Sequence, residues 1–287
     1  IGMTSLQVRR PQFDLDGEIP FCWNPQNPGF SLITNAVSVI AIAFEKYIVA
    51  STRQAMPFIR DPAVAEEADA FLRQEAQHAS AHRLHMKALA RRYPGLQEMI
   101  DKAIACYDEL LLHKPLKYHL AYAADLEATF TPTFKMWLDH EEHLFRPGDD
   151  RVASLFLWHF VEEVEHRSSA LLIYRAICDS EAYRLSILPS VARHIFRLLH
   201  VIVEGFNTHV PFEHRRVDAR VLLPTWKVDR SVDPLAGVPT NARYTALWRI
   251  LSSQVPNHDP EHQPLPRFAD LWLERHARGD DITHYYA

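Results

Sequence analysis

Glycine is scarce in this sequence. The 287 residues include only 8 glycines, less than half the roughly 7% that is usual. All-β folds and nucleotide-binding α/β folds need glycine in tight turns and phosphate loops, so both are disfavoured. Between Gly29 and Gly205 only Gly95 and Gly148 occur, each directly after a proline. Pro-Gly pairs mark turns, so the sequence predicts long helices on either side of them.

Cysteine, basic clusters and long apolar runs are also lacking. Cys22, Cys106 and Cys178 are too far apart for a disulfide framework or a cysteine zinc site. The formal net charge is −5 without a block of basic residues, so nucleic-acid binding has no electrostatic support. The apolar run 30–44 is shorter than the ~20 residues that span a bilayer, and no signal peptide is recognisable. We therefore expect a cytoplasmic protein without a membrane span.

Hydrophobic periodicity predicts an all-α protein with six long helices. Capping and stop signals place them at 31–52, 62–92, 96–113, 115–145, 149–178 and 181–209. We expect Pro132 to kink or interrupt the fourth helix and Pro189 to bend the sixth. The first helix is apolar nearly all round, which predicts a central, buried position.

The ends of the chain differ from its middle. Residues 1–30 are irregular in pattern, and residues 211–287 hold 8 of the 19 prolines. We expect a helical bundle domain at 31–210 and a proline-rich extension at 211–287. Short helices at 242–253 and 267–278 are predicted to pack on the bundle.

Two Glu-x-x-His motifs are the strongest chemical signal. Glu75 and His78 lie in the second predicted helix, and Glu163 and His166 in the fifth. Residues three apart share one face of a helix, so each pair can reach a single ion. A carboxylate and an imidazole suit iron, manganese or zinc.

A lone glutamate precedes each motif on a separate helix. Glu45 lies 30 residues before Glu75 (75 − 45), and Glu127 lies 36 residues before Glu163 (163 − 127). Glu45 stands in an apolar run, where a charge is costly unless it binds a metal or a partner. Two carboxylates from two helices and two Glu-x-x-His motifs from two others form the ligand set of four-helix di-iron carboxylate proteins.

Each half of the sequence adds a histidine on the same helical face. His82 follows His78 by four residues, and His159 precedes Glu163 by four. His159 would complete a set of seven ligands, whereas His82 is expected more as a neighbour of the metal site than as a ligand.

Several residues are candidates for a substrate pocket. Phe71, Tyr122, Phe130 and Trp158 lie near the motifs and would exclude water, although plain core packing also explains them. His200 and Glu204, four apart in an apolar run, would form a buried pair that lines a cavity or makes a structural hydrogen bond.

The two motif blocks, 71–82 and 158–166, resemble a bacterial family described as predicted metal-dependent hydrolases. The resemblance covers about residues 15–215, and the ligand pattern looks like that of ferritin-like di-iron proteins. The element His159-x-x-x-Glu163-x-x-His166 is also similar to di-iron arylamine N-oxygenases, and this resemblance implies that His159 is a ligand. In other di-iron oxygenases the residue before each paired Glu hydrogen-bonds a histidine of the opposite half, which implies that role for Gln74 and Glu162.

We therefore expect a ferritin-like four-helix bundle with two additional helices and a di-iron oxygenase or oxidase function. Two iron ions, or a manganese–iron pair or zinc, would bind, with O2 as co-substrate and a small organic molecule as substrate. An electron-donor protein and a homodimer are left open. The alternatives are a two-metal hydrolase of an ester or phosphate, a non-enzymatic iron-binding protein, and a metal-free scaffold.

Overall fold

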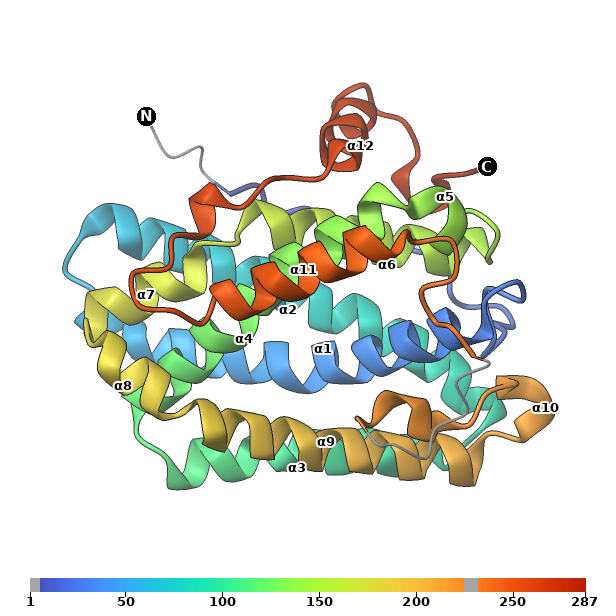
Figure 1. Ribbon diagram of the computed structural model, residues 1–287, viewed down its shortest axis with the longest axis horizontal. Helices are drawn as coiled ribbons and strands as arrows, with labels where there is room; N and C mark the ends of the chain where they lie inside the picture. The colour runs from blue at the N-terminus through green and yellow to red at the C-terminus, as the bar shows by residue number, and fades with distance from the viewer. Residues whose placement is uncertain (1–5, 225–231) are drawn as a thin grey trace.

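The computed structural model describes residues 6–224 and 232–287. Every regular element within these residues is a helix, so the predicted all-α class is confirmed (Figure 1).

A central group of helices contains both motifs. It consists of α1 (Pro28–Ala55), α2 (Pro62–Arg92), α4 (Leu116–Asp139), α6 (Asp150–Glu165) and α7 (Ser169–Ile177). α1 packs along α2, and α4 packs against α6, α7 and α1. The starts of α1 and α2 are set by Asn27 and Asp61, whose side chains accept backbone N–H bonds while a proline occupies the first turn.

A second layer covers one side of α1. It is formed by α3 (Leu96–His113) and α9 (Leu188–His209), which run side by side (Figure 1). The short α8 (Glu181–Ser186) leads into α9. These elements are the additional helices that the sequence predicted.

The C-terminal part folds back over the central helices. After α10 (Phe212–Arg215) and η2 (Ala219–Leu222), α11 (Thr240–Ser252) lies along α4. α12 (Arg267–Ala277) packs on α4 and α6, and η4 (Ile282–His284) packs on α6. The short elements η1 (Met56–Phe58), α5 (Glu141–Leu144) and η3 (Pro260–His262) join the longer helices.

Three of the six long predicted helices are broken or end earlier than expected. The helix expected at 149–178 breaks after Glu165, because His166 leaves helical geometry and its carbonyl accepts the N–H of Ser169 instead. The helix expected at 115–145 runs through Pro132 without interruption and ends at Asp139. The helix expected at 181–209 is broken at Ile187, close to Pro189, where the bend was predicted.

The segment Pro28–Phe58 is long and apolar enough to cross a membrane, with a mean hydropathy of 1.6. However, 72% of its most apolar window is buried inside the protein by the surrounding helices. Burial of this kind is typical of the core helix of a globular bundle.

Candidate metal centre

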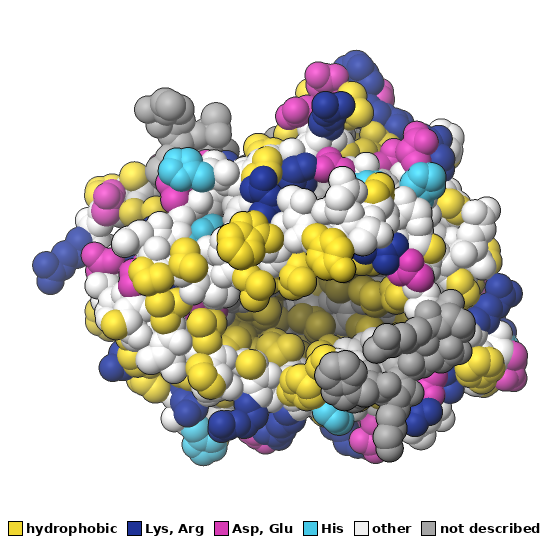
Figure 2. Space-filling model, in the orientation of Figure 1, with side chains coloured by type: hydrophobic (Ala, Val, Ile, Leu, Met, Phe, Trp, Pro, Cys, Tyr) yellow, Lys and Arg dark blue, Asp and Glu magenta, His cyan; other side chains and the backbone are white. Residues whose placement is uncertain are grey.

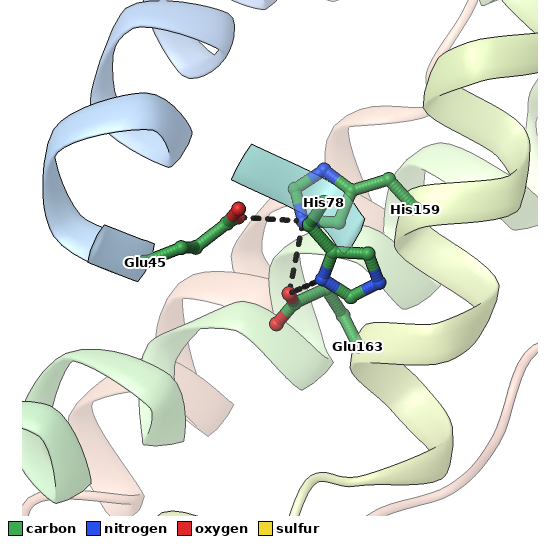
Figure 3. A group of neighbouring side chains, drawn as sticks. All are labelled: Glu45, His78, His159 and Glu163. Atoms are coloured by element: carbon green, nitrogen blue, oxygen red, sulfur yellow. Dashed lines mark hydrogen bonds and ion pairs between the residues drawn. The ribbon is translucent and has the colours of Figure 1, made fainter. Parts of the chain in front are cut away.

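The seven predicted ligands lie close together between the central helices. Glu45 extends from α1, Glu75 and His78 from α2, Glu127 from α4, and His159, Glu163 and His166 from α6 and its end. All seven are buried. Two groups among them bring their ligand atoms within 4.8 Å of one another: Glu45, His78, His159 and Glu163 in one, and Glu75, Glu163 and His166 in the other. Figure 3 shows the first group, whose side chains point toward one another.

Glu163 belongs to both groups and faces each with a different oxygen. Its Oε1 lies 2.9 Å from His159 Nε2, which is also 3.0 Å from Glu45 Oε1. Its Oε2 lies 3.3 Å from His166 Nε2, which is 3.1 Å from Glu75 Oε1. This carboxylate therefore spans two neighbouring positions.

Glu127 lies beside the second group. Its Oε2 is 3.7 Å from His166 Nε2. The geometry thus provides two carboxylates of its own for the second position, in addition to the shared one.

The cluster contains buried polar atoms without a hydrogen-bond partner among the described residues. They are Glu45 Oε2, both carboxylate oxygens of Glu75, His78 Nδ1, Glu127 Oε1, Glu163 Oε2 and His166 Nε2. Leaving such atoms unpaired in the core is costly. The donor types suit iron, manganese or zinc, and two divalent cations would balance the charge of four carboxylates. The residues present therefore fit a pair of metal ions.

The carboxylates titrate unequally when no cation is beside them. Burial and repulsion from Glu163 raise the pKa values of Glu75 and Glu127 well above the ordinary value. Burial also raises the pKa of Glu45, although His159 opposes this. For Glu163, His166 and His159 outweigh burial and hold its pKa well below the ordinary value. Glu163 is therefore the carboxylate that stays ionised most readily.

Each of the three histidines is held by a hydrogen bond from its other ring nitrogen. His78 Nε2 lies 2.9 Å from Glu162 Oε2, and His166 Nδ1 lies 3.0 Å from Gln74 Oε1. Gln74 and Glu162 each hold a histidine of the opposite half, in the manner that the family resemblance implies. Because these two acceptors are oxygens, His78 and His166 donate to them, and the other nitrogen of each ring faces the cluster.

His82 holds the third histidine. Its Nε2 lies 2.8 Å from His159 Nδ1, and its Nδ1 lies 2.9 Å from Ser38 Oγ. Ser38 Oγ is also 2.9 Å from His85 Nδ1. Both nitrogens of His82 are thus engaged, one by His159 and one by Ser38, and His82 belongs to neither ligand group, so the structure places it behind His159. Burial, together with His159 and His85, holds its pKa well below the ordinary value, which keeps the ring neutral.

The N-terminal segment fixes the residues behind the histidines, which no pattern in the sequence predicts. The carbonyl oxygen of Gln7 accepts a bond of 3.0 Å from Gln74 Nε2, which turns Gln74 Oε1 toward His166. Arg9, itself buried, donates to Glu162 over 2.9 Å and also to Glu165. Ser38 was missed too, since a serine in an apolar helix resembles ordinary core packing.

The aromatic candidates pack around the cluster. Phe71 lies edge-on to His166 and Trp158 edge-on to His78, with ring centroids 4.9 Å apart in both cases. Both rings are fully buried, so they shield the histidines from water. Tyr122 is also buried and hydrogen-bonds His194, whereas Phe130 is partly exposed.

The predicted buried pair His200 and Glu204 is wrong. Both side chains are exposed on α9. The buried stripe of this helix runs through Leu198, Ile202 and Phe206 instead, so positions 200 and 204 fall on the solvent side.

Comparisons with known proteins agree with a metal-dependent role. The family model described as predicted metal-dependent hydrolase matches residues 7–233. No curated protein and no solved structure matches significantly. The family description agrees with the hydrolytic alternative rather than with oxidation, and the matched region includes all seven clustered residues. The match covers most of the chain, which therefore belongs to the family of predicted metal-dependent hydrolases.

Proposed function

We propose that this chain is a two-metal enzyme of ferritin-like architecture that uses O2 to oxidise a small organic molecule. The observation that carries the proposal is the convergence of four carboxylates and three histidines on two buried positions, with Glu163 facing both. Bound there, a pair of iron ions would supply the electrons for reducing O2. Manganese with iron, or zinc, are the other pairs that these ligands accept.

The protein's own residues would hold the ions and limit access to them. Carboxylates favour oxidised iron, and the histidines fix the position of each ion. Phe71 and Trp158 keep water away from the histidines. Glu162, Gln74 and His82 keep the imidazoles in one orientation, which preserves the ligand geometry while the charge of the site changes.

Hydrolysis of an ester or phosphate is the second candidate, and the family description favours it. A pair of ions can activate water and polarise a substrate oxygen. The burial of the cluster among aromatic side chains supports oxidation in preference, because O2 and an apolar substrate enter such surroundings at little cost, whereas a charged phosphate would lose its hydration.

The two chemistries are separated by loading metal-free protein with different ions. We expect iron(II) protein to consume O2 and develop colour when air is admitted. Glu163→Gln is expected to lose this reaction, while Glu142→Gln, at a solvent-exposed position of α5, keeps it. A zinc or manganese form that hydrolyses nitrophenyl esters or phosphates, with no O2 uptake by the iron form, would establish the hydrolase instead.

The same preparation tests the non-enzymatic alternatives. An enzyme should bind about two ions per chain, whereas a storage protein should accumulate far more in a large assembly. Equally low metal content in the wild type, Glu45→Ala and His166→Ala would leave only a scaffold. Comparing turnover with and without an added reductase tests the proposed electron donor, and light scattering tests the proposed homodimer.

A further inference from the structure

The outward side of α11 carries an unusual row of large apolar side chains. Tyr244, Leu247, Trp248 and Leu251 are all exposed, with Trp248 at 70% of its full accessibility. Their spacing of three and four residues puts them on one face of the helix. The opposite face, which includes the buried Ala246, packs against α4. The helix therefore turns its more apolar face outward.

This row borders a hollow in the molecular surface. Figure 2 shows the hollow crossing the middle of the molecule, with apolar side chains along its rim and floor. In Figure 1 the same region lies between α11 and α9, with α1 behind it. α1 and α9 carry partly buried apolar side chains, among them Ile33, Val37 and Ile40 on α1 and Ile195 and Leu199 on α9. We define the apolar groove as this hollow together with the α11 row.

A row of phenylalanine rings lies beside the metal cluster. Phe44, next to Glu45 on α1, packs edge-on against Phe130 of α4, with ring centroids 6.1 Å apart. Phe130 packs on Phe134 at 5.2 Å, and Phe134 lies 6.3 Å from the ring of His159. Of the three phenylalanines only Phe130 is partly exposed. It also follows Glu127 by three residues, so the two side chains leave α4 on the same face.

The chemistry of the groove identifies its ligand. The apolar row itself carries no charge, and the charged neighbours on α11 are Arg243, which is paired with Asp233, and Arg249, which lies beside Tyr244 and Trp248 and contacts Gln263. A largely polar ligand would therefore find few partners along the row. An aliphatic chain would bury apolar surface along its whole length.

We propose that the apolar groove binds the substrate, and that this substrate is an elongated molecule with an aliphatic chain, whose end reaches the metal cluster past Phe130. The role of the groove in catalysis rests on the proposed function, whereas the binding of an aliphatic chain does not. Phe130 acts in it as a positioning residue that determines how far the chain can enter.

Binding can be measured without turnover or metal. The metal-free and metal-loaded proteins are titrated with cis-parinaric acid, a fluorescent polyene fatty acid, and the probe is then displaced with straight-chain alkanoates of increasing length. We expect saturable binding to both forms, and displacement that strengthens by about fourfold for each added CH2. Leu247→Glu and Trp248→Glu should weaken probe binding about tenfold or more, because each places a charge at the rim.

Leu112→Glu is the matched control, since Leu112 is 77% exposed on α3. It should bind the probe like the wild type. All three substitutions are at exposed positions, and circular dichroism with metal content verifies that the fold is kept.

Each outcome decides a different point. Absence of saturable binding, or binding that the rim charges do not alter, overturns the groove assignment even if O2 uptake is observed. Probe binding without any O2 uptake would support the groove assignment and contradict only the proposed oxidase function. A wild-type dimer that both rim variants convert to monomers, without probe binding, would show that a second copy covers the α11 row.

Discussion

Metal loading of the cluster is expected to release protons. His78 is buried, which opposes its protonation, but the carboxylates of Glu162 and Glu163 outweigh burial and raise its pKa to about 10. The pKa values of Glu75 and Glu127 are raised well above the ordinary range by burial and by Glu163. A raised pKa means that a group keeps its proton to a higher pH, and that proton must leave before the group binds a cation.

The structure sets the size of this effect. At a pKa of about 10, His78 carries an extra proton at neutral pH in the metal-free protein. The raised pKa values of Glu75 and Glu127 favour their protonated forms, whereas the lowered pKa of Glu163 favours its ionised form. Filling both positions should therefore release at least one proton, so the overall binding constant should rise about tenfold or more per pH unit near neutrality.

Calorimetric titration with zinc(II), which undergoes no redox reaction, measures the proton number directly. The heat of binding is recorded in several buffers at one pH, and its slope against the ionisation enthalpy of the buffer gives the protons released. Glu75→Gln should lower the number by about one, and the surface control Glu142→Gln should leave it unchanged. Release of fewer than one proton, or an affinity that does not rise with pH, would refute the protonated state inferred for the empty carboxylates.

Three further outcomes follow from the same geometry. The raised pKa of Glu75 favours its protonated form without metal, which an amide resembles. Glu75→Gln should therefore alter the free energy of unfolding of the metal-free protein by less than about 1 kcal/mol, yet abolish the rise in Tm on adding zinc. Strong destabilisation of the metal-free form in urea would contradict this. His82→Leu should weaken metal affinity about 10- to 100-fold, because His159 loses the partner that orients it. Chelator competition measures this affinity, and an unchanged value would show that His82 does not orient His159. Arg184→Met should lower the free energy of unfolding in urea by about 3 kcal/mol, since the buried Arg184 donates to the buried Asp125 over 2.8 Å. Adding Asp125→Leu to this variant should recover part of the loss. No recovery would mean that packing dominates.

The helical period explains why the sequence could predict the seven clustered residues. Spacings of three and four put Glu75 with His78, and His159 with Glu163 and His166, on single helical faces. Glu45 was identifiable because a charge in an apolar helix needs a partner. The way in which the structure brings these faces together depends on packing between helices far apart in sequence, which periodicity does not encode.

Residues outside regular helices escaped prediction for a related reason. Gln7 and Arg9 lie in an extended segment without any periodic signal, and their role depends on partners more than sixty positions away. His200 and Glu204 failed for the opposite reason. Their apolar surroundings suggested burial, but each lies two positions from a residue of the buried stripe, which puts it on the opposite side of α9.

The hydrogen bonds that join the N-terminal segment to Gln74 and Glu162 also affect the order in which the fold forms. Arg9 and Glu162 are separated by 153 positions, so their contact closes a loop spanning more than half the chain. Contacts of such separation form late in folding because the entropy of loop closure opposes them. During synthesis Arg9 can bond to Glu162 only after α6 has been made, so the histidines acquire their final hydrogen-bond partners late. The cluster should therefore become competent for tight metal binding only after the helices have assembled, which protects a nascent chain from capturing metal in an unfinished site.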